Sequence, residues 1–313
     1  MSSQVTVLAG GVGAARFLRG LFELVDQSDV TVIANTGDDS VFHGLYISPD
    51  IDTVVYTTAG AIDPERGWGL ADESWRAMEA LQRYEGSGAV TWFNLGDRDL
   101  ATHLWRTGRL ADGHSLTEVT AELAASWGLR YRLLPVTNDT LRTVVGTDEG
   151  DLAFQEYFVR HRHGIPVTSV RFDGAETARA GAGVIAAIAD AQHVVIAPSN
   201  PLVSIGPLLA VNGVGQALRT ARERCTAISP IVAGAALKGP ADRMLAELGH
   251  EANVVGVARL YAPYICTLII DSADADRADE VRACGVDVIV TDTIMSRPGV
   301  GVSLAKAALL AEP

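Results

Sequence analysis

The start of the chain alternates between strand-like and helix-like segments in a way that strongly limits the fold. An apolar run at 5–8 leads directly into a glycine-rich turn at 10–13, and residues 14–24 then carry apolar side chains at helical spacing. A second, β-branched run follows at 30–34. Two strands joined by a helix form a βαβ unit, whose strands are parallel and whose crossover is right-handed. The sequence therefore predicts a parallel sheet covered by helices.

The same alternation returns in the second half of the chain. Strand-like runs occur there at 194–197, 227–232, 266–270 and 286–290. Between the two alternating parts, the sequence predicts helices with polar loops and then short strands at 131–135, 141–146 and 152–159, with a hairpin turn at 147–150. We interpret residues 1–313 as a single α/β domain with a Rossmann-like, doubly wound, mainly parallel sheet. Residues 72–160 are predicted to form a helical and β-hairpin insertion within it.

Polar or glycine-rich clusters follow several predicted strands. They lie at 10–13, 35–39 and 199–200. Ligands of open parallel sheets bind outside the carboxyl ends of the strands. The sequence therefore predicts a nucleotide-type site at that edge, without reference to any relative.

The glycine turn matches only part of a dinucleotide-binding fingerprint. Glycines let a backbone approach phosphate oxygens, and the start of the following helix stabilises their charge. Arg16 stands near the place of the third glycine, and the second strand ends in Asn35 instead of the acid that binds a ribose. The turn also holds no Walker lysine. Phosphate binding is therefore favoured over NAD binding or a P-loop, and a purely structural βα turn is the alternative.

Four aspartates, Asp38, Asp39, Asp50 and Asp52, crowd the segment after the second strand. Carboxylates at strand ends suit a hard cation such as Mg²⁺, which bridges phosphate oxygens. The alternative is that Asp50 or Asp52 caps a helix through 54–58. Capping explains one aspartate but not four, so we predict that at least one of them binds a metal.

Three further loops are candidates for ligand contact. The stretch 63–69 (DPERGWG) is either a substrate lid or a surface loop with a packed tryptophan. Arg98 stands between two aspartates in a glycine turn, so it forms a structural ion pair or points at a ligand anion; His103, close behind it, is typical of a structural histidine. Ser199 and Asn200, between two prolines, are able to contact a base or a sugar, although turns use the same residues.

Composition excludes several classes of protein. The formal net charge is −13, with 38 acidic against 25 basic residues, which argues against general nucleic-acid binding. The three cysteines are far apart and form no C-x-x-C pair, so neither a disulfide framework nor a zinc site is expected. No signal peptide and no membrane-spanning segment is predicted. We expect a cytoplasmic protein.

The motifs, taken in order, resemble those of the 2-phospho-L-lactate transferase family of coenzyme F420 biosynthesis. The matching segments span residues 10–245 and are GGVGAARFLRG, NTGDDSVFHGLYISPDIDTVVY, GAIDPERGWG, NLGDRDLATHL, LLPVTND, FQEYFVR, APSNPLVSIGP, ISPIVAG and KGPADRML. The resemblance implies a Rossmann-like core, a Mg²⁺ requirement and a homodimer. It also implies transfer of a phospho-carboxylate unit from a guanosine diphosphate-activated donor to the ribityl hydroxyl of a deazaflavin alcohol, Fo, with release of GMP. The acid stays open among 2-phospho-L-lactate, phosphoenolpyruvate and 3-phosphoglycerate.

The same resemblance implies roles for individual residues. Gly11 and Gly13 would hold the diphosphate, and Asp39 and Asp50 would hold Mg²⁺. Asp50 and Arg98 would border the Fo site, and Asp50 or Asp52 would orient or deprotonate the attacking hydroxyl. The expected substrate-binding set is completed by Asn35, Thr53, Ser199 and Asn200, of which the last two would contact the nucleoside.

Two other functions fit part of the pattern. One is a nucleotide-sugar-binding regulatory protein without turnover, from a related family that shares the GG-x-G start and the PSNP-type loop. GDRD and PERGWG favour the transferase over it. The other is an NAD(P)-dependent oxidoreductase, which Asn35 and Arg16 disfavour.

Overall fold

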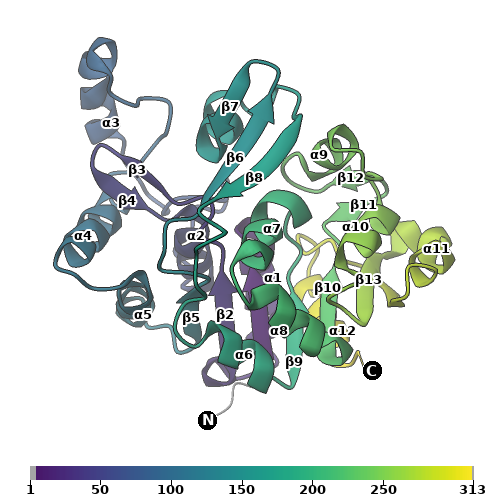
Figure 1. Ribbon diagram of the computed structural model, residues 1–313. Coiled ribbons are helices and arrows are strands. Elements are labelled where there is room, and N and C mark those ends of the chain that lie inside the picture. Colours follow the sequence, from purple (N-terminus) through teal and green to yellow (C-terminus); the bar gives the residue numbers. More distant parts are fainter. Residues whose placement is uncertain (1–4, 312–313) are drawn as a thin grey trace.

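A seven-stranded parallel sheet forms the centre of the molecule in the computed structural model, which describes residues 5–311 (Figure 1). In spatial order the strands are β14 (Asp287–Thr291), β13 (Thr267–Asp271), β10 (Cys225–Ile228), β9 (His193–Ile196), β1 (Val5–Ala9), β2 (Val30–Ala34) and β5 (Arg132–Pro135). Each neighbouring pair runs parallel. The predicted doubly wound α/β fold is therefore confirmed.

The direction in which the sheet grows reverses at β1. The chain first builds outward through β2 to β5, then returns to the other side of β1 with β9 and continues through β10 and β13 to β14. The loops after β1 and β9 therefore diverge and leave a crevice between them, which is where ligands of such sheets bind.

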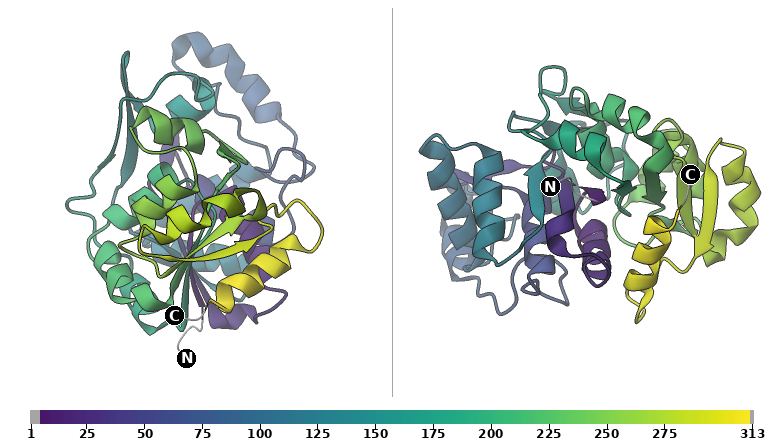
Figure 2. Two further views of the ribbon diagram at one scale, coloured as in Figure 1. Left: turned by 90° about the vertical axis from the view of Figure 1, so that its right-hand side faces the viewer. Right: turned by 90° about the horizontal axis from the view of Figure 1, so that it is seen from below.

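Alternate residues of the strands pack against helices on opposite faces of the sheet. Leu8 and Ile33 belong to the core on one face, and Val7 and Val32 belong to the core on the other. The first core packs against α6 (Val184–Asp190), α7 (Gly206–Ala210), α8 (Val214–Thr220), α10 (Val254–Tyr261) and α11 (Ala278–Arg282). The second packs against α1 (Val12–Leu21), α2 (Pro49–Thr58), α5 (Leu116–Ser126) and α12 (Val300–Leu309). The view from below in Figure 2 shows the two helical layers.

The first and last helices, α1 and α12, touch backbone to backbone. A Cβ atom on Gly20 of α1 would collide with the backbone of Gly301 in α12, and would lie 2.9 Å from the backbone nitrogen of Val302. Only glycine at this position permits so close an approach. The position of α1 therefore depends on α12.

Three smaller units rise above the end of the sheet opposite the N-terminus (Figure 1). The first comprises the hairpin β3 (Ser40–Phe42) and β4 (Leu45–Ile47), α3 (Arg76–Leu81), a 3-10 helix (Gln82–Ser87) and α4 (Asp99–Ala111). The second is a three-stranded sheet of β7 (Gly150–Ala153), β6 (Arg142–Thr147) and β8 (Ser169–Asp173). The third comprises the hairpin β11 (Ile231–Val232) and β12 (Ala235–Ala236) with α9 (Ala241–Glu247).

Short helical turns complete the secondary structure. They are 3-10 helices at Gln27–Asp29, Arg222–Arg224 and Ser272–Arg277, and π-helical turns at Glu156–Arg160 and Pro201–Ile205. Between residues 5 and 311, every helix is too short or too polar to cross a membrane.

Two predicted strands end earlier than the sequence suggests. The strand expected at 152–159 stops at Ala153, because Phe154 and Tyr157 are buried three residues apart, which is a helical spacing. The strand expected at 227–232 breaks at Pro230, which has no N–H group to continue the ladder, and its second half forms the β11–β12 hairpin.

The predicted insertion at 72–160 is not separate from the central sheet. Strand β5 lies within it and pairs with β2, whereas β8, which lies beyond it, completes the small sheet. The division of the chain into domains stays a prediction.

Candidate active site

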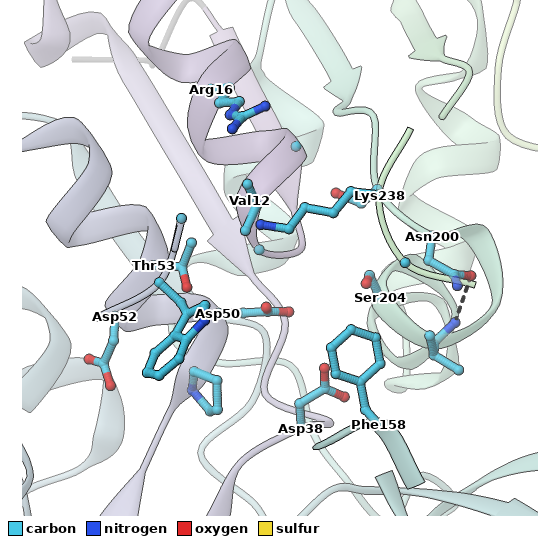
Figure 3. Close-up of a pocket in the computed structure, with 18 of the residues that line it drawn as sticks. Val12, Arg16, Asp38, Asp50, Asp52, Thr53, Phe158, Asn200, Ser204 and Lys238 are labelled. Carbon is cyan, nitrogen blue, oxygen red and sulfur yellow. Dashed lines mark hydrogen bonds between the residues drawn. The ribbon is translucent and has the colours of Figure 1, made fainter. Parts of the chain in front are cut away.

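A cavity of about 800 Å³ opens across the crevice between the loops that follow β1 and β9 (Figure 3). Its walls come from the turn before α1, the first turns of α2, the loop at 198–204, and segments at 229–230, 237–241 and 293–296. Loop residues 67–69 and 93–95, and residues of the helical turn at 154–159 that follows β7, also line it. The predicted site at the carboxyl edge therefore coincides with a real cavity that both halves of the chain enclose.

The glycine turn brings the backbone into the cavity wall. Gly11 and Gly13 line the cavity, and the N–H of Gly10 donates to Ser199 Oγ at 3.3 Å. The first-turn N–H groups of α1 have no partner within the helix, and this end of the helix carries partial positive charge. The turn is therefore suited to an anionic ligand.

The two glycines are required for different reasons. A Cβ atom on Gly11 would lie 2.6 Å from Asp50 Oδ1, at the mobile end of a side chain, whereas one on Gly13 would collide with the backbone carbonyl oxygen of Pro198. We expect Gly11→Ala to fold and to lose at least about tenfold in kcat/KM, because it displaces Asp50. Gly13→Ala should instead lower the melting temperature, because backbone cannot yield as a side chain can. Equal melting temperatures for the two variants would contradict this division.

Two cations face the cavity near the start of α1. Arg16 lies one turn into α1, and Lys238 extends from its loop so that its ammonium group lies beside Val12 (Figure 3). Partial desolvation and the charge of Arg16 lower the pKa of Lys238. Two positive charges held close together beside a helix N-terminus form a strong attraction for phosphate oxygens.

Three carboxylates bring negative charge to the same site: Asp38 and Asp50 line the cavity, with Asp50 Oδ1 beside Gly11, and Asp39 lies behind the lining. Burial raises the pKa of Asp38 well above its usual range, and repulsion from Asp50 and Asp39 adds to the rise. Burial also raises the pKa of Asp39 to about 8 and that of Asp50 to about 6. Such mutual repulsion is relieved when a cation binds between the carboxylates.

Each carboxylate has an oxygen available for such a cation. Asp39 accepts hydrogen bonds at Oδ2 from Tyr46 and Ser48, both at 2.9 Å, and its Oδ1 is buried without a hydrogen-bond partner among the described residues. The same holds for Oδ1 of Asp38. Asp50 accepts from Asn35 Nδ2 at Oδ2, also at 2.9 Å, while its Oδ1 faces Gly11. The oxygen-only donor set fits a hard divalent cation such as Mg²⁺.

Helix capping does not explain these acids. Helix α2 begins at Pro49 with Ser48 as its N-cap, so Asp50 and Asp52 lie inside its first turns. The alternative interpretation, in which Asp50 or Asp52 caps the helix, is therefore wrong. Asn35, predicted to bind substrate, is fully buried; it positions Asp50 and accepts from the N–H of Gly37 at 2.8 Å.

Asp52 belongs to a buried network that the sequence did not predict. Arg106 of α4 forms a two-pronged ion pair with both carboxylate oxygens of Asp52, and His103 lies within 3.8 Å of the same group. Asp99 lies 3.3 Å from His103 and accepts a 2.6 Å hydrogen bond from Tyr56. Although burial opposes it, the contact with His103 lowers the pKa of Asp99. The network leaves Asp52 with both oxygens occupied.

Asp52, Asp99 and His103 also place ligand atoms within 4.8 Å of one another, close enough for a metal. The guanidinium group of Arg106 already supplies a positive charge to Asp52. The charge of Arg106 also acts on Asp39, whereas no cationic side chain among residues 5–311 offsets the charges of Asp38 and Asp50. We therefore place the candidate cation beside Asp50 and not at Asp52.

The remaining predicted residues lie in or near the same cavity. Thr53 and Ser199 line it, as does Asn200, whose Oδ1 accepts from the N–H of Leu202 at 2.9 Å and so caps the following turn. Arg98 is exposed outside the cavity lining, where its guanidinium group donates to the carbonyl oxygen of Ala71 at 2.7 Å. The structure thus gathers most of the predicted set and leaves Arg98 at the periphery.

The acids beside Arg98 do not hold it in an ion pair. Asp97 accepts from the N–H groups of Arg76 and Ala77 at the start of α3, both at 3.1 Å, and Asp99 points into the buried network. The structural ion pair considered for the GDRD turn is therefore wrong.

Sequence reasoning missed Arg16 and Lys238 as site residues. Arg16 was interpreted only as a departure from the dinucleotide fingerprint, although its place one turn into α1 is a signal for an anion. Lys238 is one of two lysines in the chain. The scarcity of lysine does not indicate where in the fold this side chain lies. Only the fold brings these two side chains together.

Comparison with known proteins extends over the whole chain. The family described as 2-phospho-L-lactate transferase CofD matches residues 5–305. A protein named phosphoenolpyruvate transferase from Mycobacterium avium (strain 104) is 43% identical over 331 aligned residues, which cover 98% of each chain. Another of that name from Kitasatospora aureofaciens is 43% identical over 312 aligned residues, which cover 98% of this chain and 97% of the relative. A crystal structure of a UPF0052-family protein from Bacillus halodurans has a TM-score of 0.62 at 16% identity, covering 99% of both chains, and supports the fold alone.

Proposed function

The chain belongs to the 2-phospho-L-lactate transferase CofD family and is a transferase, and from that premise we propose its substrates. It moves a phospho-carboxylate unit, 2-phospho-L-lactate or phosphoenolpyruvate, from a guanosine diphosphate-activated donor to the deazaflavin alcohol Fo. The products are F420-0 or its dehydro form, and GMP. The names of the two similar relatives favour phosphoenolpyruvate as the acid.

The observation that carries the proposal is that cationic and acidic groups meet in one cavity. Arg16, Lys238 and the glycine turn suit the diphosphate of the donor, while Asp50, whose Oδ1 lies beside Gly11, and Asp38 line the same cavity. A cation held by these carboxylates would offset their charge and that of the diphosphate. The donor's nucleoside would then lie along the loop that carries Ser199 and Asn200.

Mg²⁺ is proposed as the cation, held by Asp39 and Asp50. When bound, it would neutralise charge on the phosphate oxygens. The chain itself contributes positioning: Asn35 holds Asp50, and Tyr46 with Ser48 holds Asp39. The predicted homodimer and cytoplasmic location stay predictions.

In the proposed reaction, the acceptor's hydroxyl oxygen attacks the phosphorus atom that carries the carboxylic acid. The bond from that phosphorus to the bridging oxygen breaks, GMP leaves with the bridging oxygen, and the hydroxyl proton passes to a carboxylate. Asp50 suits that role better than Asp52, because Arg106 occupies both oxygens of Asp52. A positioned base of this kind accelerates proton transfer by about 10²–10⁴-fold.

A direct assay tests the proposed function. The protein is incubated with Fo, Mg²⁺ and each acid in its guanosine diphosphate-activated form, and the deazaflavin product is identified by mass spectrometry. We expect one acid to give a product heavier than Fo by the phospho-acid unit, together with one equivalent of GMP. If the protein binds a UDP-sugar and leaves Fo unchanged with every donor, the nucleotide-sugar-binding regulator is the better description.

A further inference from the structure

A half-exposed tryptophan, Trp68, stands in the wall of the cavity. It lies in the loop that follows α2 and lines the cavity, directly after Gly67, where a Cβ atom would lie 2.9 Å from Lys238 Nζ. Trp68 is 40% exposed, more than any of the other four tryptophans. Burying such a ring against another planar ring releases water from both apolar faces.

The ring is held firmly although it is exposed. The guanidinium carbon of Arg66 lies over it, 5.5 Å from the ring centroid, and Trp75 meets it edge to face with centroids 5.8 Å apart. Arg66 is fixed in turn by an ion pair with Asp63 at 3.0 Å and by a 2.9 Å hydrogen bond to the carbonyl oxygen of Leu70. Contacts of Arg66 with both indoles add cation–π attraction.

The backbone of the loop that carries Trp68 is held by hydrogen bonds within the loop. The N–H of Asp63 donates to the carbonyl oxygen of Gly69 at 3.1 Å, and the N–H of Gly67 donates back to Asp63 at 2.9 Å. Ile62 and Leu70 form an antiparallel bridge at the base of the loop. Such a loop presents its side chain in one place, which lowers the entropy lost when a ligand binds.

We propose that Trp68 is the stacking platform for the planar ring of the acceptor. The proposal rests on the proposed function in taking that acceptor to be a deazaflavin alcohol. Stacking there would leave the ring's polyol chain free to reach Asp50 and Thr53, which line the same cavity. The supports from Arg66 and Trp75 make the loop a fixed wall, not a mobile lid.

The test compares Trp68→Leu, Trp68→Phe and a control, Trp92→Leu. Trp92 lies in the loop between the 3-10 helix at Gln82–Ser87 and α4, packed against Phe42 and Phe93, and outside the cavity lining. We expect Trp68→Leu to raise the Kd and KM for Fo by about ten- to a hundredfold, and Trp68→Phe to raise them less. The KM for the activated donor and the Kd for GMP should stay within about twofold, as should every constant of Trp92→Leu. Binding of Fo should also shift its visible absorption band in the wild type and Trp68→Phe but not in Trp68→Leu.

Each other outcome has a distinct meaning. If the wild type converts Fo and Trp68→Leu binds Fo as tightly, the stacking proposal is wrong and the proposed function stands. If Trp68→Leu weakens the binding of GMP and not of Fo, the stacking proposal is also wrong, because guanine would then be the stacked ring. If the wild type binds Fo without converting it, the proposed function fails while the Kd comparison still decides the role of Trp68. Absence of any Fo binding overturns both.

Discussion

An Asp50→Asn variant is expected to lose at least about a hundredfold in kcat/KM, the lower range for loss of a catalytic base. At the same time its melting temperature without Mg²⁺ should be unchanged or higher. The physical reason is that the charge of Asp50 raises the pKa of buried Asp38, so removing that charge relieves repulsion in the folded protein. Rate assays and thermal unfolding measured on the same preparation check the two parts together.

The effect of Mg²⁺ on the melting temperature provides a second test of the role of Asp50. If Asp50 helps to hold the cation, millimolar Mg²⁺ should raise the melting temperature of the wild type and have a much smaller effect on the variant. Asp97→Asn is a suitable control, because Asp97 only accepts hydrogen bonds at the start of α3 and should retain both the Mg²⁺ response and the rate. A variant at Asp50 that kept more than a tenth of the wild-type rate and the full Mg²⁺ response would refute the assignment.

The second large effect is expected on stability. Arg106→Ala should lower the free energy of unfolding by about 3–5 kcal/mol, because it leaves the carboxylate of Asp52 buried without its partner. Arg106 is 1% exposed and Asp52 is 5% exposed, so water cannot replace the guanidinium group. Urea unfolding measures the change.

Helix α4 offers a matched control for that variant. Arg109, one turn further on, pairs with Glu122 at 2.6 Å, but both side chains are substantially exposed. Arg109→Ala should therefore leave the free energy of unfolding nearly unchanged. A double variant, Arg106→Met with Asp52→Asn, should recover part of the lost stability, because no unpaired charge remains. Equal losses for Arg106→Ala and Arg109→Ala would show that burial of the ion pair does not matter.

The parts of the fold that could be predicted are those with a local signal. The glycine turn, the β-branched strand at β2 and the polar strand ends are visible in short windows, and together they place the site at the carboxyl edge of the sheet. The broken strand after Ile228 also had a local signal in Pro230, which the apolar run around it concealed. The turn into a π-helix after Ala153 was visible in the spacing of buried aromatic residues.

The roles of the acids could not be assigned in the same way. Asp50 and Asp52 lie on the same helix and look alike in sequence, but Asn35 holds the first and Arg106 pairs with the second. Arg106 lies 54 positions from Asp52 on another helix, so only the tertiary structure distinguishes the two carboxylates. The same applies to Lys238, which the β11–β12 hairpin carries to the start of α1.

The contact between Gly20 and Gly301 couples one wall of the cavity to a helix that lies outside the cavity lining. Helix α1 carries the glycine turn at one end and packs against α12, so a displacement of one helix moves the other. A side chain introduced at Gly20 would collide with the backbone of Gly301, and would therefore tilt the first helix and shift its N-terminus. Variation at this helix contact can thus change the shape of the cavity while every residue that lines it stays the same.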